Sequence, residues 1–245
     1  MSGALDRAGF FLRDLGELLA AVTRRWPLAA WGVWAGLFCL FSYGAIDRPL
    51  ALALKAAVPG TNLEGFFKTV TWLGEGGFWI VPPLLAALFF WWRRRRAIEW
   101  DEGWERESRL GQWFRSSLFL GGTVAASGAF VAVIKAMIGR YRPRYLFDEG
   151  LYGFNPFSTK WAMNSFPSGH SQTAFAAMIA LSLILPNQAW VFYALAVLIA
   201  ASRIVITVHY LSDTVMGAYV GTLFAVLLHR YCHRQGWTLR LDGQK

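Results

Sequence analysis

Hydrophobic residues occur in six long runs separated by short polar segments. Each run has roughly 17–25 residues, the length that an α-helix needs to cross the hydrocarbon core of a bilayer. Pro82-Pro83 should kink the second run or delay its start, and only Pro186-Asn187-Gln188 separates the fourth run from the fifth, which favours an antiparallel hairpin. The pattern predicts an all-α fold, a six-transmembrane-helix bundle, with spans at 28–46, 76–92, 114–138, 168–186, 189–207 and 211–229.

Two shorter patterns predict helices that lie on the membrane surface. In residues 4–23, apolar residues recur every three or four positions, which is typical of an amphipathic helix on the inner surface. Residues 49–58 and 62–73 should form short outer helices, broken at Pro59-Gly60, with Asn62 as the N-cap of the second. We therefore expect one domain over 1–245, made of an interfacial helix (1–27), a six-span core (28–230) and a cytoplasmic tail (231–245).

Composition and charge support a membrane protein with both termini in the cytoplasm. The chain is 56% hydrophobic, contains 13 Trp and 19 Phe, and has a mean hydropathy of +0.36, too apolar for an ordinary soluble domain. With the N-terminus inside, the inner segments carry 15 of the 24 Lys and Arg residues and the outer loops carry 7. The net charge of +9 is concentrated beside the apolar runs, for instance at Arg93–Arg96, so we expect contacts with anionic lipid and no nucleic-acid partner.

The two cysteines and the N-terminus carry little further information. Cys39 lies inside an apolar run and Cys232 in the basic tail, so we expect no disulfide between them, and the cysteine spacing offers no metal site. Asp6, Asp14 and Glu17 argue against a signal peptide at the N-terminus.

Cationic residues stand at the ends of two runs. Lys135 and Arg142 are seven residues apart, and both would face one direction if the helix continued between them, although Pro143 should end it. Arg203 ends the fifth run. Arginine can bind two phosphate oxygens at once and lysine acts as a point charge. Taken one at a time, these residues are equally typical of side chains that reach the lipid headgroups.

Pro167-Ser168-Gly169-His170 opens the fourth run, with Ser165 or Asn164 as the expected N-cap. A helix N-terminus directs free N–H groups at an anion, Gly169 lets a ligand approach the backbone, and Ser168 adds a hydroxyl. Alone, this segment is more typical of an ordinary capped helix with a surface histidine.

His209 stands just before the sixth run and Asp213 lies at its start; they are four residues apart, one turn if the helix begins near Thr207. A carboxylate at that offset can accept the imidazole Nδ1–H and leave Nε2 as a nucleophile. Alone, the pair is more often structural. The predicted topology, however, brings all three motifs to the same outer face, and their combination favours a phosphate site.

At this point the chain resembles the type 2 phosphatidic acid phosphatase superfamily of integral membrane lipid phosphatases. The family's motifs K-x6-R-P, P-S-G-H and S-R-x5-H-x3-D are all present without departure over residues 135–213. The superfamily's soluble haloperoxidases share these motifs, but six spans exclude that branch. The resemblance implies that His209 attacks phosphorus, Asp213 orients it, and His170 protonates the leaving oxygen and then activates water. It also implies a phosphate-binding group of Lys135, Arg142, Ser168, Gly169 and Arg203.

The resemblance further implies a metal-independent lipid phosphatase that acts on a phosphomonoester or diphosphate headgroup. Candidate substrates are a polyprenyl diphosphate, phosphatidylglycerol phosphate, phosphatidic acid or a lipid A type molecule. A lipid phosphotransferase and a catalytically silent lipid-binding protein remain as alternatives, although the intact motifs argue against the second. We expect no cofactor and no metal, a lipid phosphate and the bilayer as partners, and a bacterial inner membrane location with a periplasmic site. The sequence leaves the oligomeric state open.

Eight aromatic residues lie in the segment 139–166, the loop that joins the first two motifs. They suit a membrane–water interface, either as a lid over the lipid headgroup or a wall for the acyl chains, or as anchors that do not contact the substrate. Both interpretations stay open at this stage.

Overall fold

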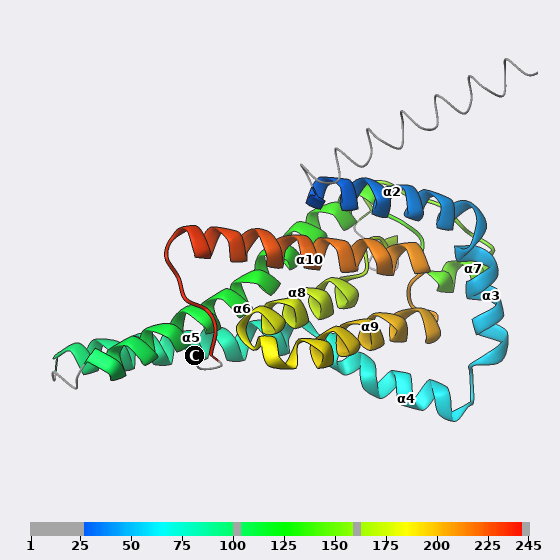
Figure 1. The fold of residues 1–245 in the computed structure, drawn as a ribbon. Coiled ribbons are helices and arrows are strands. Elements are labelled where there is room, and N and C mark those ends of the chain that lie inside the picture. Colours follow the sequence, from blue (N-terminus) through cyan, green and yellow to red (C-terminus); the bar gives the residue numbers. More distant parts are fainter. Residues whose placement is uncertain (1–26, 100–103, 159–162, 242–245) are drawn as a thin grey trace, which may run out of the picture.

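The computed structural model describes residues 27–99, 104–158 and 163–241 and forms a helical bundle (Figure 1). The amphipathic helix expected at 4–23 lies outside the described residues. In chain order the elements are α2 (Pro27–Ala45), α3 (Asp47–Ala57), α4 (Asn62–Val70), the 3-10 helix η1 (Thr71–Gly74), α5 (Gly76–Glu99), α6 (Trp104–Ile138), α7 (Pro143–Glu149), α8 (Gly169–Ile184), the 3-10 helix η3 (Pro186–Gln188), α9 (Ala189–Val205) and α10 (Leu211–Arg234).

Helix α8 is the centre of the bundle and contacts α6, α9 and α10 (Figure 1). The approach of α10 to α8 depends on two glycines, because a Cβ at Gly217 or Gly221 would lie 2.4 Å from the backbone oxygen of Ser168 or Gln172. Small side chains let neighbouring membrane helices pack backbone against backbone. Helix α8 also contributes small side chains to its contacts with neighbouring helices, and its fully buried alanines are Ala174, Ala176, Ala177 and Ala180.

The predicted all-α membrane fold is confirmed, whereas the number of spans depends on how α8 is counted. Within the described ranges, five segments are long and apolar enough to cross a bilayer: Pro27–Ala45, Asn62–Ile98, Ser108–Ile138, Pro186–Val205 and Leu211–Arg234. Helix α8, the predicted fourth span, has 16 residues, so it is ~24 Å long against a ~30 Å hydrocarbon core. Since other helices enclose α8, its length is not set by contact with lipid.

Several predicted boundaries shift once the helix ends are seen. Pro82 and Pro83 lie inside a continuous α5 and do not delay its start. The short helices expected at 49–58 and 62–73 are present as α3 and as α4 with η1. Asn62 is not the N-cap of α4, because the hydroxyl of Thr61 accepts the hydrogen bond from the Glu64 N–H.

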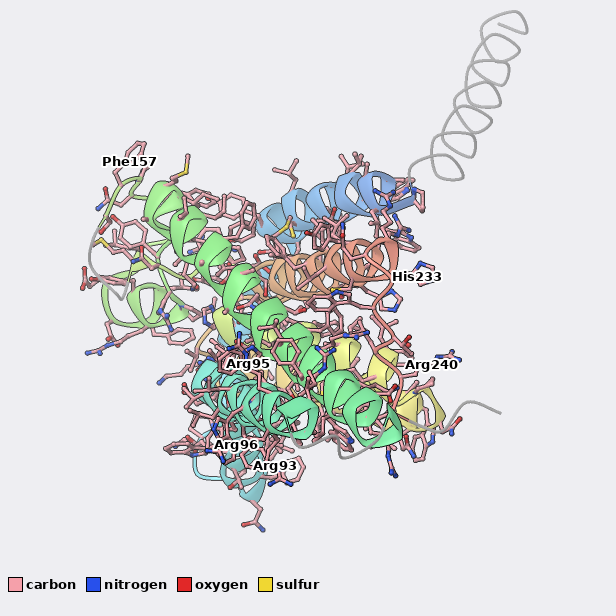
Figure 2. All side chains as sticks on the ribbon, turned by 90° about the vertical axis from the view of Figure 1, so that its left-hand side faces the viewer. Arg93, Arg95, Arg96, Phe157, His233 and Arg240 are labelled. Carbon is pink, nitrogen blue, oxygen red and sulfur yellow. The ribbon has the colours of Figure 1, made fainter. Side chains whose placement is uncertain are left out.

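The two ends of the bundle differ in chemistry. Helices α6 and α9 finish, and α8 and α10 begin, at the end on the right of Figure 1, beside α3, α4 and α7. The opposite end, which faces the viewer in Figure 2, carries Arg93, Arg95, Arg96, His233 and Arg240. There the Arg95 and Arg96 guanidinium groups lie 4.3 and 5.1 Å from the ring centres of Trp91 and Trp92, which is typical of a membrane–water interface.

Candidate active site

All the predicted site residues lie at the end of the bundle where α6 and α9 finish and α8 and α10 begin. This convergence follows from the antiparallel arrangement of consecutive helices, which returns the chain to the same end at every second connection. The residues brought together are Lys135, Arg142, Ser168, Gly169, His170, Arg203, His209 and Asp213.

His209 is held by a buried carboxylate and a buried hydroxyl. Its Nδ1 lies 3.5 Å from Oδ2 of Asp213 and 3.3 Å from Oγ of Ser165. The Ser165 hydroxyl donates to the same Asp213 oxygen over 2.6 Å, so its oxygen remains able to accept a hydrogen bond from the Nδ1–H. With the imidazole proton on Nδ1, Nε2 carries the free lone pair that a nucleophile needs.

The His209–Asp213 contact does not arise from one helical turn, as the sequence pattern predicted. Helix α10 begins at Leu211, after His209, and Tyr210 is its N-cap. The chain turns sharply out of α9 because Thr207 adopts a positive φ of 52°, and both Val208 N–H and His209 N–H donate to the Arg203 oxygen over 3.1 Å. Asp213 lies in the first turn of α10 and also accepts the Tyr210 N–H over 2.9 Å, so the helix cap and the histidine share one carboxylate oxygen.

The surroundings of His209 keep its imidazole neutral. Burial lowers the pKa of His209 well below its ordinary 6.5, the hydrogen bond that its ring donates to Asp213 opposes this, and the charges of Arg142 and Lys135 lower the pKa further. A neutral imidazole with its proton on Nδ1 is the form that can attack phosphorus.

Two cations, Arg142 and Lys135, are close enough to act electrostatically on His209, and a third, Arg203, lies close to Arg142. Lys135 donates from Nζ to the backbone carbonyl oxygen of Asn164 over 2.8 Å. The Arg203 guanidinium donates to the hydroxyl of Thr71, which belongs to η1. Burial lowers the pKa of Arg142 to about 10, with Asp213 acting in the opposite sense, so Arg142 stays charged at neutral pH. Lys135 and Arg142 are not on one continuous helix, because α6 ends at Ile138.

Ser168 links the second motif to the third. It is the N-cap of α8, in place of the expected Ser165 or Asn164, and its Oγ accepts from the N–H and the hydroxyl of Ser171 over 3.4 and 3.0 Å. The hydroxyl proton of Ser168 is therefore free to be donated elsewhere. Its backbone N–H donates to the backbone carbonyl oxygen of Asp213 over 2.9 Å. This bond connects the start of α8 to the start of α10.

His170 faces a carboxylate that sequence reasoning missed. Its Nε2 lies 3.1 Å from Oε1 of Glu75, which follows η1 and whose side chain is 51% exposed. His170, Glu75, Lys135 and Gly169 all line a cavity of about 240 Å³ between η1, α6 and α8. An imidazole that bonds a carboxylate beside this cavity is placed to hold and release a proton.

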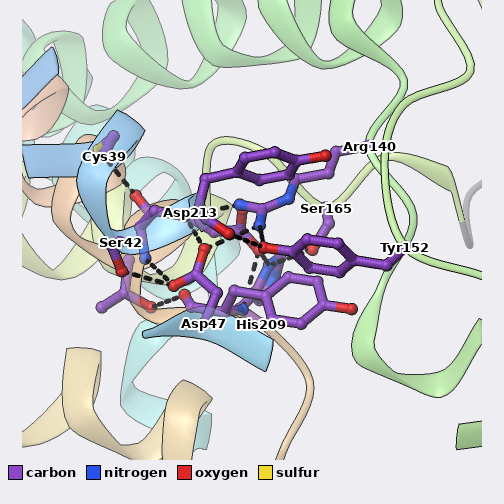
Figure 3. A network of polar contacts seen from close by, with 12 residues as sticks. Cys39, Ser42, Asp47, Arg140, Tyr152, Ser165, His209 and Asp213 are labelled. Carbon is purple, nitrogen blue, oxygen red and sulfur yellow. Dashed lines mark hydrogen bonds and ion pairs between the residues drawn. The ribbon is translucent and has the colours of Figure 1, made fainter. Parts of the chain in front are cut away.

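A second missed feature is the buried ion-pair network behind Asp213 (Figure 3). Arg140 donates from Nη1 to Oδ1 of Asp213 over 2.5 Å and from Nη2 to Oδ2 of Asp47 over 2.8 Å. Asp47 is the first residue of α3. Arg140 lies only two residues before Arg142, inside the K-x6-R-P stretch, but Asp47 is 93 residues away and no local pattern connects the two.

The aromatic segment 139–166 is partly folded inward. Tyr152 stacks on Tyr43 of α2 with ring centres 4.8 Å apart, and Phe154 lies 5.2 Å from the same ring. Phe157 instead projects from the surface, 78% exposed (Figure 2). Residues 143–149 of the segment form α7, and Trp161 lies outside the described residues. Tyr152 and Phe154 therefore support the site from behind, and a lid role for the segment remains a prediction.

Comparison with known proteins decides the family. The profile of the PAP2 superfamily matches residues 116–237, a range that contains every predicted site residue. The chain belongs to the PAP2 superfamily. Asp47 and Glu75 lie before the matched range of this PAP2 protein.

Relatives of this PAP2 protein include two enzymes named lipid A 1-phosphatase. One, from Rhizobium johnstonii, is 37% identical over 133 residues, which cover 54% of each chain. The other, from Rhizobium etli, is 38% identical over 133 residues and 56% of its length is covered. The chain spans about half the length of the curated relatives it matches.

Two crystal structures share the PAP2 fold of this chain. LpxE from Aquifex aeolicus has a TM-score of 0.50 at 23% identity, covering 76% of this chain and 96% of its own. A PAP2 type phosphatidylglycerolphosphate phosphatase from Bacillus subtilis has a TM-score of 0.51 at 19% identity, covering 82% and 96%. At these identities the likeness concerns the fold.

Proposed function

We propose that this PAP2 protein is a lipid phosphatase that transfers a phosphoryl group to His209 and then to water. The observation that carries the proposal is the buried imidazole of His209, whose Nδ1 faces Asp213 and Ser165 and whose other nitrogen is left for phosphorus. Enzymes of this chemistry need a positioned nucleophile and cations around the phosphoryl oxygens, and Lys135 and Arg142 act electrostatically on His209.

In the first step, Nε2 of His209 forms a bond to phosphorus while the bond between phosphorus and the lipid oxygen breaks. His170 donates its proton to that oxygen, so the lipid leaves as an alcohol, or as a monophosphate when the substrate is a diphosphate. The positive charge that develops on the His209 ring is stabilised by Asp213. Lys135, Arg142, Arg203 and the N–H groups at the start of α8 hold the phosphoryl oxygens.

In the second step, the neutral His170 takes a proton from water, whose oxygen attacks the phosphohistidine. The bond between phosphorus and Nε2 breaks, inorganic phosphate leaves, and His209 returns to its neutral form. Glu75, 3.1 Å from His170 Nε2, stabilises the protonated His170 that this step produces and that the next turnover uses as its acid.

The substrate that we propose first is a lipid A type molecule with a phosphate monoester. The support comes from the two relatives named lipid A 1-phosphatase, at 37% and 38% identity. Phosphatidylglycerol phosphate, phosphatidic acid and a polyprenyl diphosphate would present the same phosphoryl group to the site, because the roles proposed for the motif residues concern the phosphate and not the lipid body. A panel of these lipids therefore belongs in the test.

We also propose that the site opens on the outer face of a bacterial inner membrane, with both termini inside. The basic end of the bundle, with Arg93, Arg95, Arg96 and Arg240, supports this orientation, because Lys and Arg accumulate on the cytoplasmic side (Figure 2). The same orientation makes residues 231–245 a cytoplasmic tail. Reporter fusions after Arg96 and after Gly150 would report on opposite sides of the membrane.

The experiment is a phosphate-release assay on the purified protein in detergent, with the lipid panel and excess EDTA. We expect release of inorganic phosphate in EDTA, no measurable release by His209→Ala, and unchanged release by His233→Ala, an exposed histidine at the opposite end. Full activity of His209→Ala, or a requirement for added metal, would contradict the proposal. Product analysis with a hydroxyl-bearing acceptor lipid separates hydrolysis from phosphotransfer.

A further inference from the structure

We propose that Asp47 and Arg140 are positioning residues for the His209–Asp213 pair. Arg140 orients the Asp213 carboxylate, and Asp47 balances the charge of Arg140, so that Asp213 keeps its negative charge toward the nucleophile. The inference rests on the proposed function. The three charged side chains are almost fully buried: Arg140 and Asp47 are 1% exposed and Asp213 is 0% exposed. Such charges persist in a protein interior only when they are paired and hydrogen-bonded.

Arg140 fixes the rotation of the Asp213 carboxylate. Its Nη1 contacts Oδ1 of Asp213 over 2.5 Å and Oγ of Ser212 over 2.6 Å. The other carboxylate oxygen, Oδ2, is thereby directed at Ser165, the Tyr210 N–H and His209. Arg140 holds Oδ1 of Asp213, and Oδ2 faces the His209 imidazole. A residue that does not touch the substrate can orient a catalytic side chain in this way.

Asp47 holds Arg140 and the start of α10 together. Its Oδ2 accepts from Nη2 of Arg140 over 2.8 Å, and its Oδ1 accepts from the Ser212 N–H over 3.1 Å and from the Ser42 hydroxyl over 2.7 Å. The Ser212 hydroxyl also donates to Asp47. A single side chain of α3 thus connects the end of α2, the K-x6-R-P segment and α10 (Figure 3).

Aromatic rings fix the plane of the Arg140 guanidinium. Its central carbon lies 4.4, 5.2 and 5.7 Å from the ring centres of Tyr210, Tyr43 and Tyr152, and the Tyr152 hydroxyl accepts from Nη2 over 3.3 Å. A planar cation stacked in this way keeps its two-pronged geometry, whereas a lysine would present a single point charge.

The charge balance explains why two carboxylates are needed. One guanidinium between two carboxylates leaves one net negative charge. Burial alone would lower the pKa of Arg140, but Asp213 and Asp47 raise it above its ordinary value, so the guanidinium stays charged. Without Asp47, Arg140 would neutralise Asp213, and little negative charge would remain for the imidazolium that forms when His209 attacks phosphorus.

The test compares Asp47→Asn with Asp148→Asn, a matched change in the exposed ion pair between Arg144 and Asp148. Lipid-phosphate kinetics and inhibition by inorganic phosphate are measured on protein that elutes as one species in size exclusion. We expect Asp47→Asn to lower kcat by ~10–100-fold, the range seen when an outer partner of a catalytic ligand is removed. KM and the inhibition constant of phosphate should stay within about 2-fold because Lys135, Arg142 and Arg203 are untouched.

A second comparison uses Arg140→Gln alone and combined with Asp47→Asn. Arg140→Gln leaves two buried carboxylates beside each other without a cation, so its unfolding temperature should fall clearly. Adding Asp47→Asn removes one of these charges and should restore part of the lost unfolding temperature, a coupling that separate structural roles would not produce. This comparison applies even if Asp47→Asn alone does not fold.

Three results would overturn the inference: wild-type kcat in Asp47→Asn, a parallel loss of phosphate inhibition in that variant, or a double variant whose unfolding temperature is no higher than that of Arg140→Gln alone. Each is read against wild type and His209→Ala. If wild type releases no phosphate, or His209→Ala is fully active, the proposed function fails instead. If those two controls behave as expected and Asp47→Asn matches wild type, only the positioning role fails.

Discussion

Replacing Gly217 by alanine should lower activity, although Gly217 lies one helical turn after Asp213 in α10 and is not itself a predicted site residue. A Cβ at this position of α10 would lie 2.4 Å from the backbone oxygen of Ser168 and 3.2 Å from the Gln172 N. Ordinary contact begins near 3.4 Å, so the start of α8 must move away from α10 by about 1 Å. Neither neighbour is the flexible end of a side chain, and the Ser168 oxygen already accepts the Gln172 N–H over 3.0 Å.

The magnitude follows from two opposing effects. Alanine is favoured over glycine inside a helix by about 1 kcal/mol, whereas forcing an extra methyl group into a packed contact costs about 1–3 kcal/mol. The net loss of stability is therefore small, about 0–2 kcal/mol. Activity should fall much more, because Ser168 is tied to Asp213 through its N–H and a displacement of about 1 Å at a catalytic site costs ~100-fold in rate.

The assay measures kcat and the unfolding temperature of Gly217→Ala beside Gly122→Ala. Gly122 lies inside α6, and a Cβ there would meet nothing within 4 Å, so the control reports helix propensity alone. We expect the control to match wild type in kcat and to be at least as stable. Wild-type kcat in Gly217→Ala would refute the reasoning that close α8–α10 packing sets the geometry of the site.

Three further predictions concern individual groups. The acid limb of the kcat–pH profile should lie clearly below pH 6.5, because the pKa of His209 is lowered and this proposed nucleophile stays neutral as the pH falls; a limb at pH 6.5 or above would contradict this. Glu75→Gln should lower kcat by no more than about 5-fold and move the alkaline limb to lower pH, because the half-exposed carboxylate near His170 is a weak partner; an unchanged limb would remove Glu75 from the proton transfer. Gly139→Ala should cost about 3 kcal/mol or more, because φ is +60° and the new Cβ would lie 1.8 Å from the Asn155 oxygen. Gly150→Ala, with φ of +69° and open space, should lose much less in a thermal unfolding assay.

The sequence was sufficient to predict the helical fold, because the bilayer sets the length of apolar runs. It was also sufficient to predict that the motif residues lie at one end of the bundle, because each motif stands at the end of such a run. Details that depend on single contacts were not. Thr61 rather than Asn62 caps α4, and Ser168 caps α8, since neighbouring polar residues compete for the same N–H groups. The His209–Asp213 contact was predicted, but as a helical turn and not as a turn followed by a helix cap.

The network behind the site was not predictable, because it joins residues that are far apart in the sequence. Asp47 and Arg140 each follow an apolar run, where charged residues commonly contact headgroups, and nothing in their local sequence marks them as a buried pair. Glu75 escaped notice for the same reason, since η1 brings it to His170 from 95 residues away. Pairing between distant charges is a property of the folded bundle.

The most direct test of the account is to trap the phosphorylated enzyme. The protein is mixed with a lipid phosphate labelled in its phosphoryl group and quenched within milliseconds at alkaline pH, where phosphohistidine survives, and the labelled peptide is identified by mass spectrometry. We predict label on His209 in wild type, slower formation and slower loss of label in His170→Ala, and no label in His209→Ala. Label on another residue, or hydrolysis by wild type with no trapped label under any quench, would contradict the assignment of His209 as the nucleophile.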